Sequence, residues 1–145
     1  MNCKIWKLIL CVVIGGVIIE DMLLFSYYFI FPRFEVDYLI GINVILGTLI
    51  AVIAICARNK SLWYSLLCWL ILIISCFLIS LFNAYTGFAK YLLSTFDGEI
   101  GVGTQNVIGL QYLLSEIAIF GNVVIIIILR DIFIRICKVI KRKYN

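Results

Sequence analysis

Two adjacent acidic residues, Glu20 and Asp21, lie near the centre of the first long apolar run of this sequence. The run extends from Ile5 to Phe31 and carries only one other charge, Lys7. A charge at the centre of a membrane span costs at least ~2.5–3.5 kcal/mol, and such residues commonly mark ion or substrate pathways. The pair therefore makes this run the first candidate for a site that responds to a proton, an ion or a polar substrate.

A third acid, Glu116, falls at a similar depth in the last apolar run. Glu116 lies about nine residues from the outer end of its run, a depth of ~14 Å. Glu20 and Asp21 lie about 11 residues from the outer end of theirs, a depth of ~16 Å. The sequence has no Lys or Arg at this depth, so an ion pair within the chain cannot neutralise the acids. An isolated carboxylate in dry hydrocarbon is very costly, so we expect each acid to be protonated, hydrated or bound to a cation.

Uncharged polar residues on the other runs could line the same site. Small and weakly polar residues recur at helical spacing on each of them, and Gly15-Gly16 supplies a point of close approach on the first. The candidate set is Glu20, Asp21, Glu116, Asn43, Asn122 and Ser115. Because neighbouring helical residues point ~100° apart, at most one of the two adjacent acids can face a given neighbour. The structural alternative is a protonated acid that hydrogen-bonds to Asn43, Ser115 or a backbone carbonyl.

Four apolar runs, at 5–31, 38–57, 62–82 and 107–129, are long enough to cross a membrane as helices. Hydrophobic residues make up 65% of the chain and charged residues 14%, against about 45–50% and 25% in soluble domains. A soluble four-helix protein would need polar helix faces, which these runs lack. We predict an all-α integral membrane protein: one domain over 1–145, a four-transmembrane-helix bundle with a longer outer loop at 83–106 and a basic tail at 130–145. The first half of the loop, 85–96, is compatible with a short interfacial helix, and the helical pattern of the last run continues into the tail.

Basic residues predict the orientation of the bundle. They gather before the first run, between the second and third, and after the fourth, whereas the opposite side holds only Arg33 and Lys90. Positive residues mark the cytoplasmic side, so we expect both termini in the cytoplasm of a bacterium and the chain in its inner membrane. The tail is expected to contact anionic lipid headgroups through the residues Arg135, Lys138, Lys141, Arg142 and Lys143.

Two further expectations concern the outer ends of the helices. Pro32 is expected to end the first helix, since its ring interrupts the backbone hydrogen-bond ladder. Tyr27, Tyr28 and Tyr112 are expected at the outer membrane interface, where tyrosines place a polar tip in water.

Most soluble chemistry finds no support in the sequence. The chain has no histidine and no CxxC pair, and none of its six cysteines falls in an outer loop, so we expect neither a metal, a cofactor nor a disulfide framework. The basic residues are spread along membrane boundaries, which argues against nucleic acid as a partner. We therefore predict that the protein is not an enzyme. The weakest alternative is a lipid-acting membrane enzyme that uses Glu20 or Asp21 as its acid or base.

A central Glu in the first of four helices resembles the small multidrug resistance transporters, although the strong charge asymmetry of this chain departs from their weak bias. The four-helix layout, with Asn59 and Trp63 after the second span, resembles the GtrA-like lipid-linked sugar flippases. No extended motif supports either resemblance, and no family is assigned. We predict a transport or transport-accessory protein that forms a homo- or hetero-oligomer, because four short helices barely enclose a pathway. The alternatives are a non-enzymatic binding or protective protein, such as a bacteriocin-immunity or assembly partner, and a GtrA-like flippase.

Overall fold

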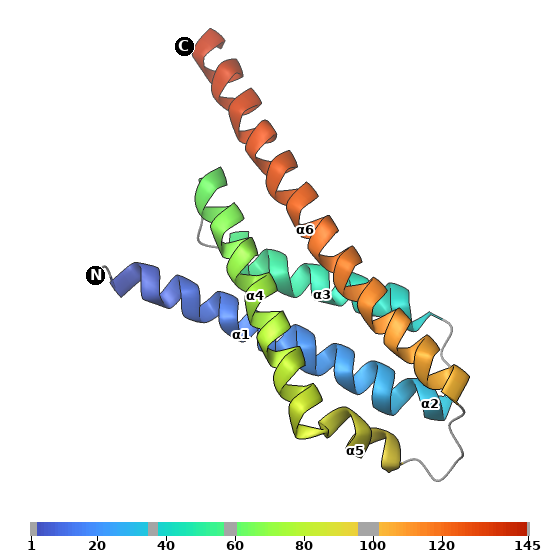
Figure 1. Ribbon diagram of the computed structural model, residues 1–145. Coiled ribbons are helices and arrows are strands. Elements are labelled where there is room, and N and C mark those ends of the chain that lie inside the picture. Colours follow the sequence, from blue (N-terminus) through green and yellow to red (C-terminus); the bar gives the residue numbers. More distant parts are fainter. Residues whose placement is uncertain (1–2, 35–37, 57–60, 96–101, 145) are drawn as a thin grey trace.

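Figure 1 shows the computed structural model, which describes residues 3–34, 38–56, 61–95 and 102–144. All regular secondary structure within these ranges is helical. Four helical stretches are long and apolar enough to cross a membrane: Ile5–Arg33, Leu39–Cys56, Leu62–Thr86 and Val107–Lys141. The prediction of an all-α chain with four such helices is confirmed, and this supports a multi-pass membrane protein. The side of the membrane that each terminus faces stays a prediction.

The chain forms seven helical segments in the described ranges: α1 (Cys3–Phe25), η1 (Ser26–Ile30), α2 (Phe31–Phe34), α3 (Leu39–Cys56), α4 (Leu62–Thr86), α5 (Phe88–Ser94) and α6 (Val102–Tyr144). The first three follow one another without a break and make one rod. That rod packs against α3 and α4, and both of these pack against α6. In Figure 1 the two chain ends lie on one side of the bundle, and α2 and α5 lie at the other.

The first helix lies close to two neighbouring helices at Gly15 and Gly16. A Cβ atom on Gly15 would lie 3.0 Å from the Cβ of Ala54 in α3, and one on Gly16 would lie 3.0 Å from the Cβ of Ser75 in α4. Gly15 therefore faces α3 and Gly16 faces α4, because successive positions on a helix point ~100° apart. Close backbone contact of this kind replaces the hydrophobic driving force that helices lack in lipid.

Pro32 does not end the first helix, which continues to Phe34. The turn just before it, η1, is π-helical, and the N–H of Phe31 bonds to the carbonyl of Ser26, five residues back. This wider turn already interrupts the α-helical ladder at the place where proline would break it. The side chain of Arg33 donates to the carbonyl of Phe29 at 2.7 Å, and so satisfies one acceptor at this helix end.

The segment expected as an outer loop is largely helical where the structure describes it. The helix α4 continues to Thr86, and Gly87 then adopts a left-handed conformation (φ 70°) that turns the chain into α5. In α5, Tyr91 is exposed while Leu92 is buried, so one face of this short helix covers the end of the bundle. The guanidinium of Arg33 donates to Thr95 Oγ1 at 2.7 Å and fastens this segment to α2.

The basic tail is not a separate segment, because α6 runs unbroken for 43 residues from Val102 to Tyr144. Its C-terminal turns extend beyond the other helices in Figure 1. The side chains of Arg135, Lys138 and Lys141 are exposed there, and Arg135 pairs with Asp131 at 2.7 Å. The side chains of Arg142 and Lys143 lie outside the described residues. Contact of this tail with anionic headgroups stays a prediction.

Candidate functional site

Glu20 is the most deeply buried acid in the described part of the chain, with 0% of its surface exposed. Lys7 and Arg33 each lie 13 residues away along the same rod, which corresponds to about 20 Å of helix in either direction. The side chain faces the interior, between α4 and α6. Its carboxyl group is therefore remote from both ends of the bundle as well as from solvent.

Tyr112 of α6 holds one oxygen of this carboxyl. The phenol of Tyr112 donates a hydrogen bond to Glu20 Oε2, and the side chain of Ser80 in α4 lies within hydrogen-bonding reach of the same phenol. The thiol of Cys76 lies against the Glu20 carboxyl and donates to the carbonyl of Gly16 at 3.8 Å. The helices α4 and α6 therefore supply the groups that surround a carboxyl carried by α1.

The second oxygen of the carboxyl, Glu20 Oε1, has no donor among the described residues. The side chain of Glu116 lies within hydrogen-bonding reach of the Glu20 carboxyl. Two ionised carboxylates are both acceptors and repel each other, whereas one protonated carboxyl can donate to the other. The geometry is therefore satisfied when the pair carries one proton. Glu116 itself is only partly buried, so it is the more accessible member of the pair.

Two further hydrogen bonds join helices on the α2 side of this pair. The phenol of Tyr27 bonds to Ser115 Oγ at 2.5 Å, and Ser26 Oγ donates to Asn43 Oδ1 at 3.0 Å. The predicted candidates Asn43 and Ser115 are thus buried beside the site, but their partners are Ser26 and Tyr27 rather than an acid. The π-helical turn that contains Ser26 and Tyr27 lets both neighbouring side chains point inward.

The structure does not bring Asp21 or Asn122 to this site. Asp21 is exposed on the outer surface of α1, because it follows Glu20 by one helical step of ~100°. Asn122 is exposed on α6, six residues after Glu116, which turns it by about 240° from that residue. The expected cluster of three acids is therefore a pair, Glu20 and Glu116, with Asp21 facing away.

A stripe of polar side chains on α4 leads away from Glu20 in one direction along the bundle. Toward α5, the stripe on α4 continues from Cys76 to Ser80 and Asn83, which are spaced at helical intervals. One buried atom of this stripe, Asn83 Nδ2, has no hydrogen-bond partner among the described residues. The polar track therefore leads from Glu20 to the α5 end of the bundle.

On the side of the chain termini a layer of apolar side chains lies next to the pair, and the buried hydroxyl of Ser65 lies further along α4. Val12, Leu72, Ile119 and Val123 are each 0% exposed. The side chain of Ile119 fills the space left by Gly47 on α3. The side chain of Leu72 reaches Gly15, five residues before Glu20. This apolar layer separates the acidic pair from the end of the bundle at which both termini lie.

The tyrosines of the site were misplaced by sequence reasoning. Tyr27 and Tyr112 are buried in the core instead of lying at the outer interface, because each phenol finds a polar partner inside the bundle. A signal was available: Tyr112 precedes Glu116 by four residues, so both share a helix face. No group of three or more His, Cys, Asp or Glu side chains suited to a metal occurs among the described residues.

Comparisons with protein-family models, with curated proteins and with solved structures found no match to this chain.

Proposed function

We propose that this protein is a small membrane transport subunit whose carboxyl pair, Glu20 and Glu116, carries a proton across the middle of the membrane. One observation carries the proposal: a fully buried carboxyl with an unpartnered oxygen lies beside a second carboxyl. A proton is the smallest species that satisfies both groups, since it turns one acceptor into a donor. Intramembrane acids that face the interior of a helix bundle are typical of proton relays.

The surroundings of the pair suit a site with access from one side. The track from Cys76 through Ser80 to Asn83 offers polar groups toward the α5 end, and the layer that contains Leu72 and Ile119 closes the other end. Transport proteins place coupling sites near the midplane and open them alternately to each side. The arrangement therefore corresponds to a site whose polar neighbours lead toward α5, and release of the proton to the other side requires a rearrangement of the apolar layer.

An assay of proton flux in liposomes tests this function. The full chain is reconstituted around an entrapped pH-sensitive dye, and a potassium diffusion potential drives protons inward. We expect the wild-type protein to acidify the lumen, and Glu20→Gln or Glu116→Gln to reduce the flux to that of empty liposomes. Either change leaves a neutral amide of similar size that cannot bind and release a proton at neutral pH.

The matched control removes a carboxyl outside the site. Asp131→Asn breaks the surface ion pair with Arg135, and exposed pairs of this kind contribute ~0.2–1 kcal/mol or less to stability. We expect this variant to retain wild-type flux. The proposal is wrong if wild-type protein passes no more protons than empty liposomes, or if both glutamine variants leave the flux unchanged.

A further inference from the structure

Asp21 presents a carboxyl on the outside of the bundle at the depth of the buried site. It makes no hydrogen bond or ion pair with any residue that the structure describes, and it is exposed on α1. The sequence has no Lys or Arg between Lys7 and Arg33, so neither end of this helix can reach it. A carboxyl that faces acyl chains at this depth has no donor, whereas nearly all buried polar groups in proteins have one.

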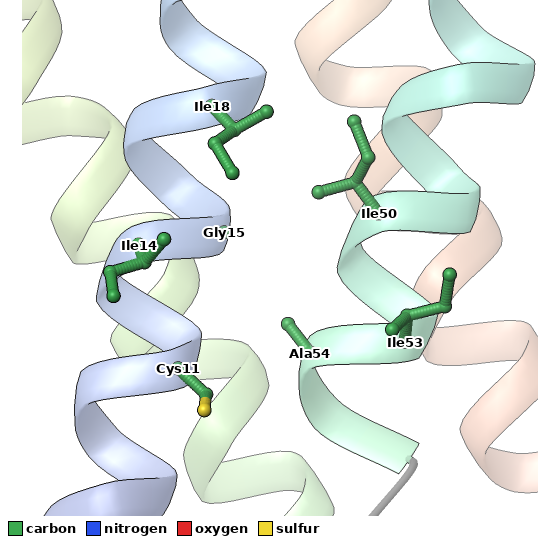
Figure 2. Close-up of a pocket in the computed structure, with 7 residues that line it drawn as sticks. All are labelled: Cys11, Ile14, Gly15, Ile18, Ile50, Ile53 and Ala54. Carbon is green, nitrogen blue, oxygen red and sulfur yellow. The ribbon is translucent and has the colours of Figure 1, made fainter.

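A groove in the same surface leads to Asp21. Four residues of α1 and three of α3 line a volume of about 420 Å³: Cys11, Ile14, Gly15, Ile18, Ile50, Ile53 and Ala54. Figure 2 shows the isoleucines of the two helices on either side of the gap, with Gly15 and Ala54 near its middle. Ile14, Ile18 and Asp21 follow one another at helical intervals, so the carboxyl lies just past the groove on the same face of α1.

We propose that this face, the α1–α3 groove together with Asp21, binds a transmembrane helix of another protein that carries a Lys or Arg near the middle of its span. The apolar groove matches the side chains of such a helix, and its two small residues, Gly15 and Ala54, leave room for close packing. The basic residue supplies the charge that Asp21 lacks, and each group is costly in lipid without the other. Acyl chains could fill the groove, but they offer no donor to the carboxyl.

A second copy of this chain fits the face less well. The sequence has no Lys or Arg in 8–32, 38–57, 61–89 or 91–129, so a second copy has no basic residue at the depth of Asp21. A parallel pair of copies related by a twofold axis would place Asp21 against Asp21, and two like charges repel. Charge complementarity therefore favours a different protein with a basic residue at mid-span.

Fluorescence energy transfer in liposomes tests the docking site with defined probes. The full chain, labelled at one end, is reconstituted with a labelled polyleucine transmembrane peptide that carries one central Lys. Two matched peptides carry Leu at that position or the Lys displaced by six residues, which is ~9 Å of helix. We expect the central-Lys peptide to bind wild-type protein at least about tenfold more tightly than either matched peptide, a difference of ~1.4 kcal/mol. We expect Asp21→Asn to abolish that preference.

Three outcomes would overturn the proposal. The three peptides could bind equally, the preference could survive Asp21→Asn, or self-association without peptide could depend on Asp21, which would assign the face to a second copy. Proton flux through Asp21→Asn protein separates this inference from the proposed function, because the variant keeps Glu20 and Glu116 and is expected to retain wild-type flux.

Discussion

Replacing Tyr112 with Phe is expected to lower the free energy of unfolding by about 1–2 kcal/mol. The change removes one hydroxyl and so deletes the donor to Glu20 Oε2. Interhelical hydrogen bonds in membranes contribute ~0.6 kcal/mol on average and at most about 1.7. The loss here is expected at the upper end of that range, because the acceptor is a fully buried carboxyl and an unsatisfied group of this kind costs more than an ordinary one.

A double-mutant cycle shows whether that loss comes from the hydrogen bond itself. In a Glu20→Met background the acceptor is absent, so Tyr112→Phe is expected to change stability by no more than a few tenths of a kcal/mol. Unfolding is followed by titration with a denaturing detergent in mixed micelles. An equal loss in both backgrounds would mean that the phenol acts through packing alone, for instance through its edge contact with Tyr27.

The change Glu20→Met is expected to act in the opposite direction and to raise the free energy of unfolding by about 1–3 kcal/mol. Keeping a Glu of ordinary pKa ~4.3 protonated at pH 7 costs about 3.7 kcal/mol. The hydrogen bond from Tyr112, which the same change removes, offsets only about 1–2 kcal/mol of that cost. Methionine is flexible and of similar length, so it can occupy the same space between α4 and α6. The same variant should show no proton flux, so stability and activity should move in opposite directions.

A buried leucine of the same helix provides the comparison for this variant. Leu23 is 0% exposed, and Leu23→Met preserves volume, so it is expected to cost less than ~1.5 kcal/mol. The informative quantity is the sign of the difference in the free energy of unfolding between Glu20→Met and Leu23→Met. If Glu20→Met destabilises the protein more than Leu23→Met, then Glu20 stabilises the fold, and the burial of its carboxyl does not lower the free energy of unfolding.

The four long helices follow from hydropathy because a membrane span needs length and apolar character, and a single sequence reports both. The residues at which these helices end cannot be predicted from hydropathy alone. Pro32 predicts a helix end from backbone sterics, but the π-helical turn before it removes the conflict. The last turn of α4 and the helix α5 lie beyond the apolar run that ends at 82, and α6 continues past its apolar part because its basic residues still favour a helix.

The site was partly predictable for a related reason. Depth along a helix can be counted, which predicts Glu20, Asp21 and Glu116 at one level. The ~100° step between neighbours requires one of Glu20 and Asp21 to point elsewhere, but it does not say which of the two. Counting residues does not identify the hydrogen-bond partner of each buried polar side chain. Tyr112, rather than Asn43 or Ser115, donates to Glu20 because the rotation and packing of the helices decide which donor lies within hydrogen-bonding distance of the carboxyl.

Infrared difference spectroscopy tests the shared proton most directly. The measurement uses Asp21→Asn protein in lipid at neutral pH, so that the carboxyl on the outer surface does not contribute, and compares spectra in H₂O and D₂O. Carboxyls in water are ionised at this pH. A proton held by the Glu20–Glu116 pair is expected to give the carbonyl-stretch band of a protonated carboxyl, shifted by deuterium, that disappears when Glu20→Gln is added. The absence of this band in Asp21→Asn protein, or its survival in the double variant, would mean that Glu20 and Glu116 do not share a proton.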